Sequence, residues 1–475
     1  MEHKQASDPE SVALHPTVEE RHARGRAVRS EVPRSAHAEW EPAPDRRDPV
    51  DLLEEQAATR VPELVPLRYG RMLVSPFTFY RGAAYLMASD LAGLPRTDLN
   101  TQLCGDAHLS NFGTFAAPDR TLVFDCNDFD ETLPGPFEWD LKRLAASFAI
   151  AGRDRGFKRK ARAAVNIEVS RSYREAMRGH AAERNLDLWY SRVHVEEILA
   201  EAAELGTREQ LKRAEKNVAK ARSKDSLRAL GKLTESVDGE LRIRNNPPVI
   251  VPIHELFEPE RHLALNEALR ELIRSYRATL SGDRRHLLEQ FRYVDAARKV
   301  VGVGSVGTRA WIMLMLGRDD ADPLFLQFKE AEASVLEPFL GASEFEQHGQ
   351  RVVEGQRLMQ AAGDIMLGWV RTSDVDGVER DYYVRQLWDA KGSALVEMMD
   401  PTALTYYARV CGRTLARAHA RAGDSVAIAA YLGRGDSFDR ALSDFAEAYA
   451  DQNERDFAAV VEAVDSGRIK TETGV

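Results

Sequence analysis

The chain has 475 residues, of which 44% are hydrophobic and 29% charged, and its formal net charge at pH 7 is −10. This length can hold two or three domains, and the composition is that of an ordinary globular protein, which excludes fibrous and wholly disordered classes. The negative charge argues against a nucleic-acid partner, because phosphate neutralisation requires a basic surface. No apolar stretch approaches the roughly 20 residues of a membrane span, and the first residues lack the apolar core of a signal peptide. We therefore expect a cytoplasmic protein without membrane contact.

The first 60 residues mix Arg, Glu, Pro and Ala without sustained periodicity. Such a segment buries too little apolar surface to offset the entropy lost on ordering. We predict that residues 1–60 form a flexible N-terminal arm, with at most one short helix near 50–58.

The stretch 104–140 concentrates polar residues of the kind used in phosphoryl transfer. Asp106, His108 and Asn111 follow the spacing D-x-H-x-x-N. A short apolar run then leads to Asp125. Oxygen ligands from Asp and Asn suit Mg²⁺, which leaves other coordination positions to water and substrate phosphates. In kinases one Asp accepts the proton of the attacking hydroxyl, while an Asn and a second Asp hold the metal ions. Asp106 is therefore the predicted catalytic base, and Asn111 and Asp125 are the predicted Mg²⁺ ligands.

Two further acids, Asp128 and Asp130, follow these residues, and the sequence assigns them no role. Residues 138–150 then place apolar side chains at helical spacing, which predicts an amphipathic helix. Residues 151–297 are also mostly helical by pattern. We expect that region to form an insert on the acceptor side of the site.

A second group of residues comes much later in the chain. Three glycines with the spacing G-x-G-x-x-G mark its start: Gly302, Gly304 and Gly307. Dinucleotide-binding folds use the same spacing, but there the glycines open a helix. Here the apolar run 310–316 predicts a strand instead, and after a turn a further strand, 324–328, leads to Lys329. This layout is typical of a kinase nucleotide lobe, in which glycines and a lysine hold the phosphates. A lysine on a buried strand also needs an anionic partner.

The acidic partner of Lys329 is expected on the next helix, 343–365. Glu354 is the first candidate, and Glu346 is the alternative. Residues 381–387 then predict a strand that leads to the connection between the lobes. Backbone groups of two residues at its end are expected to meet the adenine: Gln386 and Leu387.

The motifs G-D-A-H-L-S-N, V-F-D-C-N-D and G-P-F-E-W-D-L-K-R-L-A resemble the catalytic half of the aminoglycoside and choline type small-molecule kinases. From about residue 68 to residue 450 the chain resembles the bacterial domain-of-unknown-function family numbered 2252, which is grouped by similarity with protein-kinase-like folds. The resemblance implies ATP and Mg²⁺ as cofactors, and it implies that Asp140 holds the catalytic-loop backbone through hydrogen bonds. We interpret His108 as structural support. Cys104 departs from the kinase pattern, which has His at this position.

Residues 404–422 predict a helix that resembles the one immediately before the catalytic loop in these kinases, yet here the loop lies far upstream. Circular permutation is the economical interpretation, and it requires Lys329 and Asp125 to face one cleft. The predicted fold class is α+β, a two-lobed protein-kinase-like fold with a largely helical catalytic lobe and a small antiparallel-sheet nucleotide lobe. Five segments are predicted in order: the N-terminal arm (1–60), the catalytic-loop half (61–150), the helical insert (151–297), the nucleotide lobe (298–400) and a helical segment that completes the catalytic lobe (401–475).

The predicted function is transfer of the γ-phosphoryl group of ATP to a hydroxyl. Between Asp125 and Asp140 there is no room for a long activation segment, which favours a small-molecule acceptor. Two alternatives stay open: a non-catalytic ATP-binding pseudokinase scaffold and an adenylyltransferase on the same fold. A metal-dependent phosphohydrolase is disfavoured, because it leaves Lys329 and the glycines unexplained. The sequence identifies neither the acceptor nor a protein partner.

Overall fold

The computed structural model describes residues 16–256, 262–300, 306–373 and 376–472. It is a mixed α+β structure with antiparallel sheets. The helices of the first half are α1 (Val18–Glu31), α2 (Pro49–Ala57), α3 (Val65–Met72), α4 (Pro76–Arg81), α5 (Ala84–Ala92), α6 (Phe137–Asp154), α7 (Arg159–His180), α8 (Asn185–Tyr190), α9 (Val195–Leu205), α10 (Arg208–Arg222) and α11 (Ser226–Leu233). Those of the second half are α12 (His262–Ala278), α13 (Gly282–Leu288), α14 (Glu337–Leu340), α15 (His348–Met359), α16 (Pro401–Ala422), α17 (Ser425–Leu432) and α18 (Ser437–Asp465). The strands are β1 (Asn100–Leu103), β2 (Phe112–Ala116), β3 (Leu122–Cys126), β4 (Leu133–Pro136), β5 (Thr234–Val237), β6 (Glu240–Ile243), β7 (Ile250–Pro252), β8 (Arg292–Lys299), β9 (Ala310–Leu316), β10 (Pro323–Ala331), β11 (Gly368–Ser373), β12 (Glu379–Gln386) and β13 (Gly392–Ser393).

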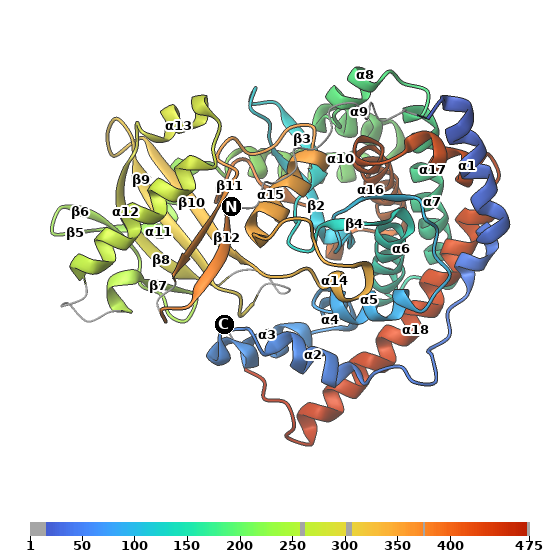
Figure 1. Cartoon of the computed structure of the whole chain (residues 1–475), viewed down its shortest axis with the longest axis horizontal. Coiled ribbons are helices and arrows are strands. Elements are labelled where there is room, and N and C mark those ends of the chain that lie inside the picture. The colour runs from blue at the N-terminus through green and yellow to red at the C-terminus, as the bar shows by residue number, and fades with distance from the viewer. Residues whose placement is uncertain (1–15, 257–261, 301–305, 374–375, 473–475) are drawn as a thin grey trace, which may run out of the picture.

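The elements form two groups that meet at α15 (Figure 1). The largest sheet and its covering helices lie on the left of the view, and a larger group of helices lies on the right. The strands β2, β3 and β4 lie on the side of the helical group that faces the sheet. None of the helices in the described part of the chain is long and apolar enough to span a membrane.

The largest sheet has six antiparallel strands in the order β11-β12-β10-β9-β8-β7. The predicted strand 310–316 is β9, and the predicted strand 324–328 lies within β10. Lys329 of β10 is paired in register with Ala310 of β9 and with Tyr383 of β12. It therefore lies on an interior strand, with a neighbouring strand on each side.

Both faces of this sheet are covered, which explains why its strands are continuously apolar. Met313 and Met315 of β9 pack in one cluster with side chains of α12. Ile312 and Leu314 pack on the opposite face with side chains of α11. Each fully buried side chain of this size stabilises the fold by about 1.5–3 kcal/mol. The sheet is thus a rigid platform for Lys329.

The main core lies among α6, α7, α16, α17 and α18. The two long helices α7 and α16 approach closely because Gly412 of α16 has no side chain. A Cβ at this position would lie 2.3 Å from Ser172 Oγ and 2.4 Å from the Val169 carbonyl oxygen. Helix α7 falls within the predicted acceptor-side insert, but it is part of this core, whereas α11 and α12 of the same region cover the large sheet.

The end of α16 lies beside β1, although the two are far apart in the sequence. Thr101 Oγ1 donates a hydrogen bond to the His419 carbonyl oxygen at 3.0 Å. A Cβ on Gly423 would lie 2.7 Å from Thr101 Cβ. In space, α16 therefore leads into β1 and the loop that follows it. β1 pairs with β4, while β2 pairs with both β3 and β13, and β13 comes directly after the large sheet in the chain.

Residues 16–60, which we predict to be part of a flexible arm, fold against the C-terminal helices. Helix α1 packs on α17. Arg29 donates to the Tyr431 carbonyl at 2.8 Å, and Arg34 donates to the Leu432 carbonyl at 2.7 Å. Cations at these positions satisfy the free carbonyls at the end of a helix. The sequence pattern does not reveal this order because α1 is polar on most sides and depends on α17 for its contacts.

Candidate functional site

The loop after β1 is held by the first turn of α6. The Asp140 carboxylate accepts hydrogen bonds from the backbone N–H groups of Cys104, at 2.8 Å, and Gly105, at 3.0 Å. His419 Nε2 of α16 lies 3.2 Å from the same carboxylate. Gly105 has a φ of 84°, and a Cβ there would lie 2.2 Å from the Glu131 carbonyl oxygen, so only glycine fits. Asp140 thus fixes the backbone from which the next residue, an aspartate, projects.

That aspartate, Asp106, is paired with an arginine of α6. Arg143 Nε donates to Asp106 Oδ1 at 2.7 Å. The second oxygen, Oδ2, lies 3.7 Å from His108 Nε2. Burial lowers the pKa of His108 to about 3, so its ring is neutral at pH 7. Asn111 Nδ2 donates to the Asp106 carbonyl at 2.7 Å. One carboxylate oxygen of Asp106 is thus held, and the side chain remains 19% exposed, as a proton acceptor requires.

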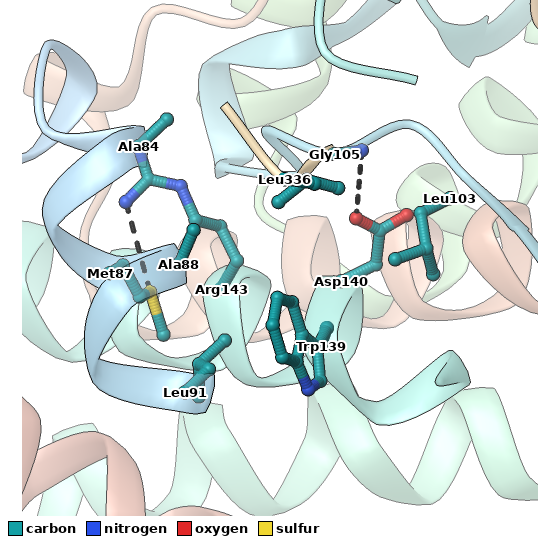
Figure 2. Close-up of a pocket in the computed structure, with 10 residues that line it drawn as sticks. All are labelled: Ala84, Met87, Ala88, Leu91, Leu103, Gly105, Trp139, Asp140, Arg143 and Leu336. Carbon is teal, nitrogen blue, oxygen red and sulfur yellow. Dashed lines mark hydrogen bonds between the residues drawn. The ribbon is translucent and has the colours of Figure 1, made fainter. Parts of the chain in front are cut away.

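A small cavity lies beneath this loop (Figure 2). Arg143 and Asp140 leave α6 in different directions: Arg143 extends toward Met87 of α5, and Asp140 toward Gly105. The other side chains that line the cavity are apolar: Ala84, Ala88, Leu91, Leu103, Trp139 and Leu336. The two polar side chains therefore brace the loop at separate points above an apolar base.

Asp125, at the end of β3, is engaged in a buried ion pair. Both of its carboxylate oxygens lie 2.6 Å from Arg417 Nη2 of α16. The Asp125 and Arg417 side chains are only 6% and 1% exposed. Burial raises the pKa of Asp125, and Arg417 opposes that effect. Because the arginine occupies the oxygens that a metal would need, Asp125 fits a structural ion pair better than the Mg²⁺ site for which we expect it.

Lys329 meets two other acids of the same segment. Its ammonium group contacts the Asp130 carboxylate and lies 3.8 Å from Asp128 Oδ1. Asp130 Oδ1 also accepts a hydrogen bond from the Tyr383 hydroxyl at 2.7 Å. The Lys329 side chain is 3% exposed, whereas those of Asp128 and Asp130 are 32% and 26% exposed. The ion pair between Lys329 and Asp130 thus links the large sheet to the segment after β3.

The two acids differ in their electrostatics. Burial acts to raise the pKa of Asp130, but the opposing effect of Lys329 is larger and brings that pKa down to about 2. Burial and then repulsion by Asp130 raise the pKa of Asp128 to about 6. For Lys329, burial acts to lower the pKa, and the two carboxylates outweigh it and raise the pKa. Asp130 is therefore the counter-ion of Lys329, while the charge of Asp128 is incompletely compensated and would be stabilised by an added cation.

These contacts decide which residues fit Mg²⁺. Within the described ranges, no group of three or more His, Cys, Asp and Glu side chains is arranged to hold a metal. Mg²⁺ needs only one or two protein carboxylates when phosphates and water complete its shell. Asp128 is such a carboxylate. The N–H of its neighbour Asn127 donates to the Asn111 carbonyl at 2.8 Å, so Asn111 and Asp128 lie on adjacent segments. Asn111 and Asp128 therefore fit the metal better than Asp125 does.

Helix α15, the second helix after β10, supplies an arginine to this region. Arg351 is buried, and its Nη2 donates to the Asp130 carbonyl oxygen at 2.8 Å. Glu354, the first candidate for the partner of the lysine, pairs instead with Arg357 at 3.0 Å. Glu346 precedes the helix, which is shorter than the predicted one. Arg351 of α15 therefore holds the backbone of the segment with Asp130, and the counter-ion of Lys329 comes from that segment and not from α15.

Two glycines predicted to hold phosphate lie outside the described residues: Gly302 and Gly304. Gly307 is described and has a φ of 90°. Its carbonyl accepts a hydrogen bond from the Val61 N–H at 2.8 Å. Arg60 Nη1 donates to the Val306 carbonyl at 2.6 Å. The chain just before α3 thus holds the residues that lead into β9.

The predicted adenine-binding connection follows β12. The Gln386 N–H donates to Asp364 Oδ2 at 2.6 Å. The Leu387 N–H donates to the Phe325 carbonyl at 2.9 Å. Both N–H groups are therefore occupied within the protein, and a base bound here would have to use other backbone groups.

Sequence reasoning missed the roles of two acids and two arginines. Asp128 and Asp130 carry a signal, because acids two positions apart beside a buried strand require a cation nearby. Arg417 carries none, since Arg409, Arg413 and Arg421 repeat at four-residue intervals along the same helix. Arg143 carries none either, because no sequence pattern pairs it with Asp106.

The model of a family described as "Uncharacterized protein conserved in bacteria (DUF2252)" matches residues 60–463. This range includes both the loop with Asp106 and the strand with Lys329. No curated protein and no solved structure matches the chain.

Proposed function

The chain belongs to the DUF2252 family, and we propose that it is an ATP-dependent phosphotransferase of the protein-kinase-like type. It moves the γ-phosphoryl group of ATP to a hydroxyl of a small-molecule acceptor, with Mg²⁺. The observation that carries the proposal is the contact of Lys329 with Asp130, with Asp128 beside them. This contact brings Lys329, for which the sequence predicts phosphate binding, to the segment that follows the Asp106 loop.

The order of elements around Lys329 supports the proposal. Strands β8, β9 and β10 are followed by the short helix α14 and then by α15, β11 and β12, and the lysine lies on the third strand. A kinase nucleotide lobe has its glycine loop between the first two strands, its lysine on the third, and a helix next. The end of α16 beside β1 supports circular permutation, because that neighbourhood would join the helix to the catalytic loop in an unpermuted chain.

Each residue then has a role in transfer. Asp106 accepts the proton of the acceptor hydroxyl, while Arg143 holds its carboxylate in place. Asn111 and Asp128 would hold Mg²⁺, which neutralises phosphate charge when bound. Lys329, with Asp130 as its counter-ion, binds the ATP phosphates. The chain between β3 and α6 is too short for a protein-binding activation segment, which favours a small acceptor.

One observation favours the alternative of a non-catalytic ATP-binding scaffold. The Asp106 and Asp125 carboxylates are both paired with arginines, and such pairs stabilise a fixed surface. Asp106 nevertheless keeps one oxygen toward His108, which is neutral and does not compete for a proton. The Asp106 side chain is also 19% exposed, and an accessible carboxylate oxygen favours catalysis over the scaffold.

The test is ATP consumption by the full chain with Mg²⁺ across a library of hydroxylated metabolites. Asp106→Asn should abolish turnover and leave ATP binding intact, because the amide cannot accept the proton. Asp98→Asn, at a carboxylate that is 67% exposed, is the matched control and should turn over normally. Mass spectrometry of the product separates added phosphate from added AMP. ATP binding without consumption by any library member would favour the scaffold, and normal turnover by the Asp106 variant would remove that residue from the mechanism.

A further inference from the structure

Lys391 lies in the short connection between β12 and β13 and has no assigned role. It is half-buried, and it makes no hydrogen bond or ion pair with any residue the structure describes. Removing a lysine from water without an anionic partner is unfavourable. An unpaired cation at this position therefore calls for a partner from outside the chain.

The backbone around Lys391 is fixed in an uncommon conformation. Ala390 has a φ of 54° and is buried. Its N–H donates to the Lys224 carbonyl at 2.8 Å. Gly392, on the other side, is paired with Thr114 of β2. A left-handed conformation is unfavourable for alanine, and strain of this kind is concentrated at functional sites. The lysine is thus presented by a segment that is anchored on both sides.

Three acids attract Lys391, and each is engaged by another group. The strongest effect comes from Asp364, whose carboxylate accepts hydrogen bonds from the Gln386 backbone and side chain, at 2.6 and 2.9 Å. Asp128 lies 3.8 Å from Lys329, and Asp389 pairs with Arg120 at 2.8 Å. Arg385 and Lys329 add positive charge. Burial, followed by repulsion from Arg385, lowers the pKa of Lys391 to about 7. Lys391 therefore lacks a dedicated counter-ion, and a bound anion would favour its charged form.

Arg385 connects this position to the candidate site. Its Nη1 donates to the Asn127 carbonyl at 3.3 Å, directly before Asp128. Its Nε donates to Gln327 Oε1 at 3.2 Å. Lys391 and Arg385 thus carry positive charge beside Asp128, the acid that we assign to Mg²⁺.

We propose that Lys391, with Arg385 beside it, binds a phosphate group of the ligand. The phosphate belongs either to the nucleotide or to a phosphorylated acceptor. The inference rests on the proposed function for the identity of the nucleotide, but the binding of an oxyanion at Lys391 can be measured without turnover. Lysine is well suited to this task because its ammonium acts as a compact point charge toward phosphate oxygens.

The experiment is isothermal titration calorimetry of the full chain and its Lys391→Met variant. The probes are ATP, inorganic tripolyphosphate, adenosine, and inorganic phosphate added to the ATP-saturated protein. Lys216→Met, at an exposed lysine of α10, is the matched control. The Lys391 variant should unfold at the same temperature as the wild type or higher, because no ion pair is lost. Lys391→Gln provides a second charge-removing variant, and Lys391→Arg should restore binding.

If the nucleotide supplies the phosphate, the variant binds ATP and tripolyphosphate about tenfold or more weakly and binds adenosine normally. If the acceptor supplies it, ATP binding is unchanged and inorganic phosphate no longer binds the ATP complex. Equal binding of every anionic probe by the wild type, Lys391→Met and Lys391→Gln overturns the inference. A wild type that binds tripolyphosphate through Lys391 but neither binds nor consumes ATP would refute the proposed function and leave this inference standing.

Discussion

The ion pair between Asp125 and Arg417 gives a sharp test of which acid serves the metal. Arg417→Met leaves a carboxylate that is 6% exposed without its partner. Breaking a buried pair by removing one member costs about 3–5 kcal/mol, since the remaining charge is uncompensated. Asp125→Asn removes the same pair from the other side. The double variant leaves no unpaired charge and should recover part of the loss, which gives a coupling free energy near the upper end of the usual range of about 0.5–3 kcal/mol.

Urea unfolding measures these free energies, and the Mg²⁺ dependence of ATP consumption separates structure from metal binding. Asp125→Asn should lower the free energy of unfolding while leaving the Mg²⁺ concentration at half-maximal turnover unchanged. Asp128→Asn should raise that concentration about tenfold or more. It should not destabilise the metal-free protein, because the charge that it removes is repelled by Asp130. A stable Asp125→Asn protein with an altered Mg²⁺ requirement would refute this reasoning.

Three further outcomes are expected. Lys329→Met should weaken ATP binding in calorimetry, whereas Glu354→Gln should not, because Glu354 pairs with an arginine away from the lysine; equal affinities for both variants would displace Lys329. Gly105→Ala should lower stability and turnover together, since its Cβ would lie 2.2 Å from a carbonyl oxygen at a φ of 84°, and wild-type activity in that variant would show that the loop adapts. Burial lowers the pKa values of His37 and His108 from 6.5 to about 3, so on acidification the unfolded chain binds protons at these residues before the folded protein does. The free energy of unfolding should therefore fall as the pH drops from 6.5 toward 3. Each histidine contributes about 1.4 kcal/mol per pH unit in that window, and His37→Gln should reduce the slope measured by urea unfolding.

The sequence predicts elements whose residues carry a strong local pattern. The apolar run of β9 and the strand that leads to Lys329 are recognisable because both faces of the sheet are buried. Residues 404–422 fall within α16, whose apolar spacing is regular over the whole helix. The order of the helical core escapes prediction, because it depends on contacts such as that of Gly412 with α7.

The candidate site is predictable in its residue types and less so in their pairing. Asp106 and Lys329 are found by motif, but no pattern shows that Arg417 neutralises Asp125 or that Asp130 is the counter-ion of Lys329. A carboxylate that is buried beside a cation and one that is partly exposed beside another acid look alike in a sequence. Three-dimensional neighbours decide between a structural ion pair and a metal ligand.

The position of α16 beside β1 has a consequence for biosynthesis. On the ribosome, Asp125 and Asp140 emerge well before their partners, since Arg417 follows Asp125 by 292 residues and His419 follows Asp140 by 279 residues. Helix α18, which packs on α6, comes later still. Chains fold as units from the N-terminal side during synthesis, at about 5–20 residues per second. The helical core therefore cannot be completed in that way, because α6 and the loop after β1 lack their packing partners until α16 and α18 have left the exit tunnel.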